Sequence, residues 1–174
     1  MSFSPVPRYS FREITEISPG FLGNLGINFL MLDLDNTIAA YSEHSPAQNV
    51  MLWVSEMKSC GIKMLIVSNS RRKERVENFA ESLDIGYINA ARKPSPKHVL
   101  RAMENEGFKK AESALLGDQL YTDMLAANLA GIVSITVRPR SLKNPFLALR
   151  YALESPFRAV ARLSRWIDIL RIGT

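Results

Sequence analysis

Short apolar runs alternate along this chain with longer segments in which apolar residues recur every three or four positions. The short runs predict strands buried on both faces, because they are too apolar for loops and too short for typical helices. They cover residues 28–34, 62–67, 85–88, 114–116 and 132–137. The longer segments predict helices at residues 46–59, 71–83, 96–106 and 121–130. This alternation predicts an α/β fold, a Rossmann-like parallel sheet with helices on both faces.

The end of the chain has a different pattern. Residues 145–172 interleave apolar side chains with arginines, and Arg158, Arg162 and Arg165 recur at helical spacing. Pro156 interrupts this pattern and predicts a break between two helices. We therefore expect three parts, which are an N-terminal segment (residues 1–24), an α/β domain (residues 25–138) and a basic amphipathic helical tail as a C-terminal extension (residues 139–174).

Positive charge is concentrated in this tail. The chain has 174 residues, 47% of them apolar, which suits one domain with a substantial core. Residues 138–174 hold eight Lys or Arg and two Asp or Glu, a net charge of +6, against +5 for the whole chain. A basic amphipathic helix that carries Trp166 is typical of proteins on anionic membrane surfaces. A helix pair packed on the sheet or on another subunit explains the pattern equally well.

Composition also excludes several classes of protein. Cys60 is the one cysteine and has no partner for an intramolecular disulfide, which indicates a reducing, cytoplasmic compartment. The N-terminal segment lacks the apolar core of a signal peptide, and no segment reaches the ~20 apolar residues that cross a bilayer. His44 and His98 have no ligand partner nearby in sequence, so we expect no zinc site. Nucleic acid is not expected as a partner, because no basic and aromatic platform accompanies the charge.

Polar side chains follow the first four predicted strands. They are Asp33 and Asp35, then Ser68 and Asn69, then Lys93, then Asp118 with Asp123 beyond it. Carboxylates at the end of a buried strand are costly to desolvate, and a bound metal ion explains the first pair best. Because the carboxyl ends of parallel strands share one edge of a sheet, we expect these groups to converge in one cleft. Four further basic residues are assigned to a solvated, charged helix face and left out of the site, namely Arg71, Arg72, Lys73 and Arg75.

Taken in order, these residues resemble the four motifs of the haloacid dehalogenase (HAD) superfamily of phosphatases. The motifs are Asp33-Leu34-Asp35-Asn36-Thr37, Ser68-Asn69, Lys93-Pro94 and Gly117-Asp118 with Asp123. One helix fills the space between the first two motifs, so the chain resembles the capless subclass IIIA and, within it, the YqeG-type group. That group is similar to the phosphatidylglycerophosphate phosphatases of mitochondria and plastids.

The resemblance implies a Mg²⁺-dependent phosphomonoester hydrolase with a HAD-like fold. Asp33 would attack phosphorus and form an aspartyl-phosphate. Asp35 would protonate the leaving alkoxide and then deprotonate the attacking water. The protein's metal ligands would be Asp33, Asp118 and the backbone carbonyl of Asp35, because Mg²⁺ prefers hard oxygen ligands.

The remaining motif residues would surround the phosphoryl group. Ser68 and Asn69 would bind its oxygens, Thr37 would help to orient them, and Lys93 would stabilise the negative charge. Asp123 would orient Lys93 or a metal-bound water. The basic tail and the resemblance together favour a lipid phosphate such as phosphatidylglycerophosphate as the substrate. A small soluble phosphorylated metabolite, or a non-hydrolytic phosphoacceptor or binding module, are the alternatives.

Overall fold

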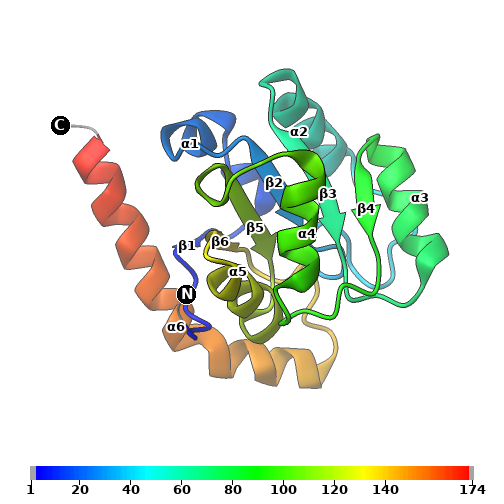
Figure 1. The fold of residues 1–174 in the computed structure, drawn as a ribbon. Coiled ribbons are helices and arrows are strands. Elements are labelled where there is room, and N and C mark those ends of the chain that lie inside the picture. The colour runs from blue at the N-terminus through cyan, green and yellow to red at the C-terminus, as the bar shows by residue number, and fades with distance from the viewer. Residues whose placement is uncertain (1–2, 173–174) are drawn as a thin grey trace.

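Within the part of the chain that the structure describes, six parallel strands form a central sheet (Figure 1). The structure is a computed structural model and describes residues 3–172, with the backbone alone for residues 162–172. The strands are β1 Tyr9–Ser10, β2 Phe29–Leu32, β3 Lys63–Val67, β4 Gly86–Ile88, β5 Ser113–Gly117 and β6 Val133–Thr136. Their order across the sheet is β1-β6-β5-β2-β3-β4.

Strand β2 lies in the middle of the sheet and is hydrogen-bonded on both edges, to β3 and to β5. Its side chains alternate between two cores: Phe29 and Met31 point to one, and Leu30 and Leu32 to the other. All four are fully buried. Burial on both faces explains why this segment is continuously apolar, and why its first polar residue marks the edge of the sheet.

Helices cover both faces of the sheet (Figure 1). Helices α2 (Gln48–Ser59) and α3 (Lys73–Leu83) pack on one face, and α4 (Lys97–Glu106) and α5 (Leu125–Ala130) on the other. The short helices are η1 Ile14–Glu16, α1 Pro19–Asn24, η2 Lys110–Glu112 and the π-helix η3 Leu120–Met124. The predicted α/β fold is confirmed, and the predicted strands and helices lie close to their expected bounds.

Strand β1 lies outside the predicted set. It consists of two residues, of which Tyr9 pairs with Ile135 in β6. The rings of Tyr9 and Phe11 contact Phe21 edge-on, with centroid distances of 5.2 and 5.1 Å. Two residues are too few to show an alternating pattern, so the sequence does not predict this strand. Backbone hydrogen bonds to β6 hold the segment at the edge of the sheet, and the aromatic contacts pack it against α1.

The predicted break at Pro156 is wrong, because a single helix, α6 (Pro145–Ile172), includes this residue. The helix continues through Pro156, and Figure 1 shows that it changes direction between its paler orange first part and its red end. A proline inside a helix removes one backbone hydrogen bond and kinks the helix, which accounts for a bend without a break. Helix α6 contacts β1. None of the described helices combines the length and apolar character that a membrane-crossing segment requires.

The predicted basic stripe of the tail also needs correction. Arg158 is 2% exposed and pairs inside the protein with buried Glu154. The side chains of Arg162 and Arg165 lie outside the described residues. Large exposed apolar side chains on α6 are Phe146, Leu149, Leu153 and Val160. The inward arginine is explained by its buried carboxylate partner, and the described part of α6 presents an apolar face outwards instead.

Candidate active site

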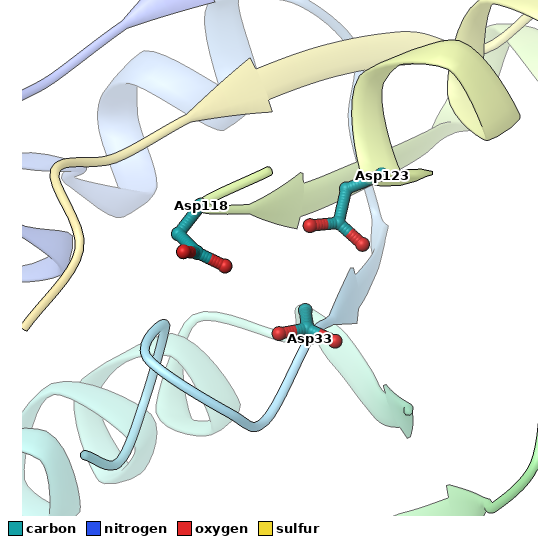
Figure 2. A group of neighbouring side chains, drawn as sticks. All are labelled: Asp33, Asp118 and Asp123. Atoms are coloured by element: carbon teal, nitrogen blue, oxygen red, sulfur yellow. The ribbon is translucent and has the colours of Figure 1, made fainter. Parts of the chain in front are cut away.

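The polar residues that follow the strands converge at one edge of the sheet. Asp33 follows β2, Ser68 follows β3 and Asp118 follows β5, and these strands are neighbours. Lys93 lies in the loop between β4 and α4, and Asp123 lies in η3. Figure 2 shows the carboxylates of Asp33, Asp118 and Asp123 around a common space. The convergence expected from the strand ends is therefore observed.

Lys93 lies between two of these carboxylates. Its Nζ is 2.7 Å from Asp33 Oδ1 and 2.7 Å from Asp123 Oδ1, and the residue is 4% exposed. Burial disfavours the charged ammonium, but Asp123 and Asp33 outweigh this effect and raise the pKa of Lys93 above its ordinary value. Lys93 is therefore a fixed positive charge beside both carboxylates.

The carboxylate of Asp33 is held at both oxygens. Lys93 Nζ donates to Oδ1, and Thr37 Oγ1 donates to Oδ2 at 3.2 Å. Thr37, which we expected near the phosphoryl group, thus contacts Asp33 itself. Burial has the largest effect on Asp33 and raises its pKa to about 7, with Lys93 lowering it and Asp123 raising it. A cation at this position would favour the ionised form of Asp33.

Gly117 provides the space that Asp123 occupies. A Cβ atom at position 117 would overlap the side chain of Asp123, so the close approach of Asp123 to β5 requires glycine there. Asp123 Oδ2 accepts a hydrogen bond from Gln119 N at 3.0 Å. Met124 N donates to Gln119 O at 3.3 Å, which is the wide spacing of a π-turn, and such turns are frequent at functional sites.

Asp33, Asp118 and Asp123 form a group that fits a divalent cation. One carboxylate oxygen from each lies within 4.8 Å of the others. Asp118 Oδ1 is buried and has no hydrogen-bond partner among the described residues, while its Oδ2 accepts from Arg150 at 3.2 Å. Burial, Asp33 and Asp123 raise the pKa of Asp118 well above its ordinary value, although Arg150 and Arg158 lower it. A hard cation would relieve this repulsion, so these residues fit the expected metal.

Asn69 positions Lys93 through the backbone. Asn69 Nδ2 donates to Lys93 O at 2.9 Å, and Lys93 N donates to Asn69 Oδ1 at 2.7 Å. Ser68 is buried at the end of β3, and its Oγ accepts a hydrogen bond from Ser70 N at 3.0 Å. The side chain of Asn69 thus holds the lysine loop, which the motif did not indicate. The phosphoryl contacts of Ser68 and of the Asn69 backbone N–H stay predictions.

Asp35 stands apart from the carboxylate cluster and pairs with Arg75. Arg75 Nε is 3.2 Å from Asp35 Oδ1, and its Nη2 donates to Ala40 O at 2.9 Å. Its Nη1 also donates to Glu43 O. The assignment of Arg75 to a solvated helix face is therefore wrong. No spacing rule connects α3 to a residue 40 positions earlier, so the contact could not be read from the sequence. Metal ligation by the Asp35 carbonyl stays a prediction.

Tyr41 is half exposed and close enough to the site for the charges of its aspartates to act on the phenol. Burial is the main cause that raises the pKa of Tyr41 to about 12, followed by the charges of Asp35, Asp118 and Asp33. The phenol is therefore neutral at ordinary pH and is available to donate a hydrogen bond to an anionic substrate. Tyr41 and Leu147 line a groove of about 440 Å³. The sequence did not single out Tyr41, because it lies in a polar loop without a motif.

Comparison with known proteins assigns the family. A family model described as a haloacid dehalogenase-like hydrolase matches residues 10–131. The chain belongs to this family. The curated protein "Probable phosphatase YqeG" of Bacillus subtilis is 34% identical to this HAD phosphatase over 160 residues, which are 92% of each chain. The predicted HAD-superfamily phosphatase of the YqeG type is therefore confirmed. Phosphatases of this family typically use a divalent metal, which the three carboxylates fit.

Solved structures share the fold of this HAD phosphatase. The 3-deoxy-D-manno-octulosonate 8-phosphate phosphatase of Moraxella catarrhalis, determined with magnesium, phosphate and KDO, matches with a TM-score of 0.54 and 16% identity over 87% of this chain and 97% of that one. The cobalt-bound deoxy-D-mannose-octulosonate 8-phosphate phosphatase of Haemophilus influenzae matches with a TM-score of 0.53 and 16% identity over 72% and 75% of the chains. At these identities the likeness shows the fold alone.

Proposed function

We propose that this HAD phosphatase hydrolyses a phosphomonoester with Mg²⁺ through an aspartyl-phosphate on Asp33, and that the substrate is a lipid phosphate such as phosphatidylglycerophosphate. The observation that carries the proposal is the position of Lys93 between Asp33 and Asp123, with Asp118 beside them. This arrangement combines a nucleophile, a fixed positive charge and a cation-binding set at one edge of the sheet.

In the first half-reaction, a carboxylate oxygen of Asp33 attacks phosphorus, and the bond between phosphorus and the ester oxygen breaks. Asp35 gives its proton to the leaving alkoxide, so the product departs as an alcohol. Lys93 stabilises the charge that develops on the phosphoryl oxygens, together with Ser68 Oγ and the backbone N–H of Asn69. Mg²⁺, when bound, neutralises the charge on the phosphate dianion and the carboxylate, which otherwise repel each other.

In the second half-reaction, water attacks the phosphorus of the aspartyl-phosphate while Asp35 accepts the proton that the water loses. The bond between phosphorus and Asp33 breaks, inorganic phosphate leaves, and both aspartates return to their starting states. Arg75 restrains Asp35 through its Nε and is anchored on the carbonyl of Ala40. Asp35, which donates a proton in the first half-reaction and accepts one in the second, is therefore held in one position.

The proposed protein ligands of Mg²⁺ are Asp33, Asp118 and the backbone carbonyl of Asp35. Asp118 supports this assignment because its buried Oδ1 has no hydrogen-bond partner among the described residues. We assign Asp123 to the orientation of Lys93, which its 2.7 Å ion pair supports. A non-hydrolytic phosphoacceptor has less support, because Asp35 supplies the acid and base that a full hydrolytic cycle requires.

The lipid part of the proposal is supported by the outer face of α6. Leu149 and Leu153 are 60% and 67% exposed there. Leu147 of the same helix lines a groove with Tyr41 and Lys143. An apolar groove with a cationic neighbour suits a leaving group that has acyl chains and an anionic headgroup. We infer that this face rests on an anionic membrane.

A small soluble phosphorylated metabolite is the second candidate substrate. It is favoured by another groove that Tyr41 also lines, together with Arg71, Arg72 and Lys73. A polar, basic groove suits the hydroxyls and anionic groups of sugar or nucleotide phosphates. Tyr41 thus lines two grooves of different chemistry, and each favours a different class of substrate.

Phosphate release from a panel of substrates tests the proposal. With Mg²⁺, we expect a kcat/KM for phosphatidylglycerophosphate in mixed micelles at least about tenfold above that for sugar, nucleotide and glycolate phosphates, or about 1.4 kcal/mol of transition-state binding. Excess EDTA should lower turnover by about 100-fold or more, because the charge on the phosphate dianion is then not neutralised. A preference for a soluble ester would favour the second candidate. Equal turnover in EDTA and in Mg²⁺ would contradict the metal-dependent mechanism.

Vesicle flotation tests the membrane face. The full chain should float with phosphatidylglycerol vesicles, and the double substitution Leu149→Glu and Leu153→Glu should reduce the bound fraction by about tenfold, because it removes apolar contacts and adds two repelled charges. The matched control is Leu52→Glu combined with Met51→Glu, two exposed apolar residues on α2. If the α6 and α2 variants bind equally, or the natural chain does not bind, the membrane part of the proposal is wrong.

A further inference from the structure

Helix α6 reaches the active site through a buried arginine. Arg158 is 2% exposed, and its guanidinium group connects three elements. Its Nη2 donates to the backbone carbonyl of Asp118, the residue directly after β5. Its Nη1 donates to Thr136 Oγ1 at 2.8 Å and to Val137 O at 3.0 Å, at the end of β6. One side chain of the tail thus ties the Asp118 turn to the neighbouring strand.

Glu154 and Arg150 extend this contact to the carboxylate of Asp118. Arg158 Nη2 is 2.7 Å from Glu154 Oε2, and Arg150 Nε is 3.7 Å from Glu154 Oε1. Arg150 Nη2 in turn lies 3.2 Å from Asp118 Oδ2. The contacts therefore run from the backbone carbonyl of Asp118 through Arg158, Glu154 and Arg150 back to the carboxylate of Asp118. The other carboxylate oxygen of Asp118, Oδ1, has no hydrogen-bond partner in the described part of the chain and is available as a ligand.

Simple packing does not explain these residues. Glu154 and Arg158 are both almost fully buried, and a helix that only covers the sheet would bury apolar side chains at these positions at lower cost in desolvation. An arginine also provides a planar fork of donors, which the carbonyl of Asp118, Thr136 and Val137 use together. These contacts fix the position of Asp118 relative to β6.

We propose that Arg158 and Glu154 are positioning residues that hold Asp118 in place for the divalent cation, so that α6 is an integral wall of the active site. The proposal rests on the proposed function of Asp118 as a metal ligand. Neither residue touches the reacting atoms. Residues that orient metal ligands in this way typically change metal affinity or activity by about 10- to 100-fold when they are replaced.

Calorimetric titration of the full chain with Mg²⁺ tests the proposal without an activity measurement. Arg158→Lys keeps the positive charge beside Glu154 but loses the fork of donors, and we expect Mg²⁺ affinity to fall by about tenfold or more. Glu154→Gln, which keeps an acceptor for Arg158, should reduce affinity in the same direction and serves if the lysine variant does not fold. The matched control is Arg101→Lys, at an exposed position of α4, which should bind Mg²⁺ like the natural chain.

Kinetics separate positioning from a general loss of structure. At saturating Mg²⁺, the Arg158→Lys protein should recover most of its turnover of p-nitrophenyl phosphate with an unchanged KM, because neither residue contacts the substrate. Folded Arg158→Lys and Glu154→Gln proteins with Mg²⁺ affinity within about twofold of the natural chain would overturn the positioning role alone. Mg²⁺ binding that is absent from the natural chain, or unchanged in Asp118→Asn, would overturn the metal assignment as well.

Discussion

Replacing Asp33 by Asn should lower turnover of p-nitrophenyl phosphate by at least about 10³-fold while the protein stays folded. An amide of the same size retains an oxygen for contact with Thr37 or Lys93, but it lacks the anionic nucleophile. Lys93 keeps Asp123 as a partner at 2.7 Å, so the substitution leaves no buried charge unpaired. Steady-state phosphate release and circular dichroism measure the two expectations. Substantial turnover by the folded variant would refute the nucleophilic role of Asp33.

The pH dependence of stability gives a second readout for the same variant. Without metal, burial raises the pKa of Asp33 from 3.8 to about 7. The folded state therefore binds more protons than the unfolded state between these values, and the contribution of Asp33 to stability is lost as the pH rises from about 4 to about 7. In EDTA, the Tm of Asp33→Asn relative to the natural chain should therefore increase between about pH 5 and about pH 8.

A surface carboxylate provides the control for this titration. Glu104→Gln changes an exposed acid on α4, and its Tm difference from the natural chain should stay nearly constant over the same pH range. A constant difference for Asp33→Asn as well would show that the Asp33 carboxylate is not destabilised by its surroundings, contrary to its buried position beside Asp123.

Replacing Lys93 by Met should damage both stability and activity. The methionine has a similar shape, but Asp33 and Asp123 then lose their shared buried counter-charge, which should destabilise the metal-free protein by about 3–5 kcal/mol. Turnover should also fall by about 10²–10³-fold, because the positive charge next to the developing phosphoryl charge is gone. Chemical denaturation in EDTA and steady-state kinetics with Mg²⁺ measure the two losses.

Lys97→Met is the matched control for this substitution, because Lys97 is exposed at the start of α4. It should change neither quantity. Added Mg²⁺ should restore much of the stability of the Lys93→Met protein, since a bound cation replaces the missing charge, but it should not restore turnover. If the two methionine variants are equally stable and active, Lys93 has neither role.

Much of the fold and part of the site followed from local patterns. The continuous apolar segment that forms β2 predicted a strand buried on both faces. In the structure its side chains alternate between two cores, and neither face is polar. Asp33, Ser68 and Asp118 were expected together because each directly follows a strand, and parallel strands end at the same edge. The order of these residues along the chain also resembled the motifs of the phosphatase family to which the chain belongs.

Contacts between distant segments were decided by packing in three dimensions. Asn69 holds the backbone of Lys93, and Arg75 pairs with Asp35, although no spacing along the chain relates these residues. Arg158 belongs to a segment that looks like a solvated basic helix, and it is buried because Glu154 and the carbonyl of Asp118 surround its guanidinium group. A local pattern shows which side chains need a partner. Which distant group meets that need depends on how the elements pack.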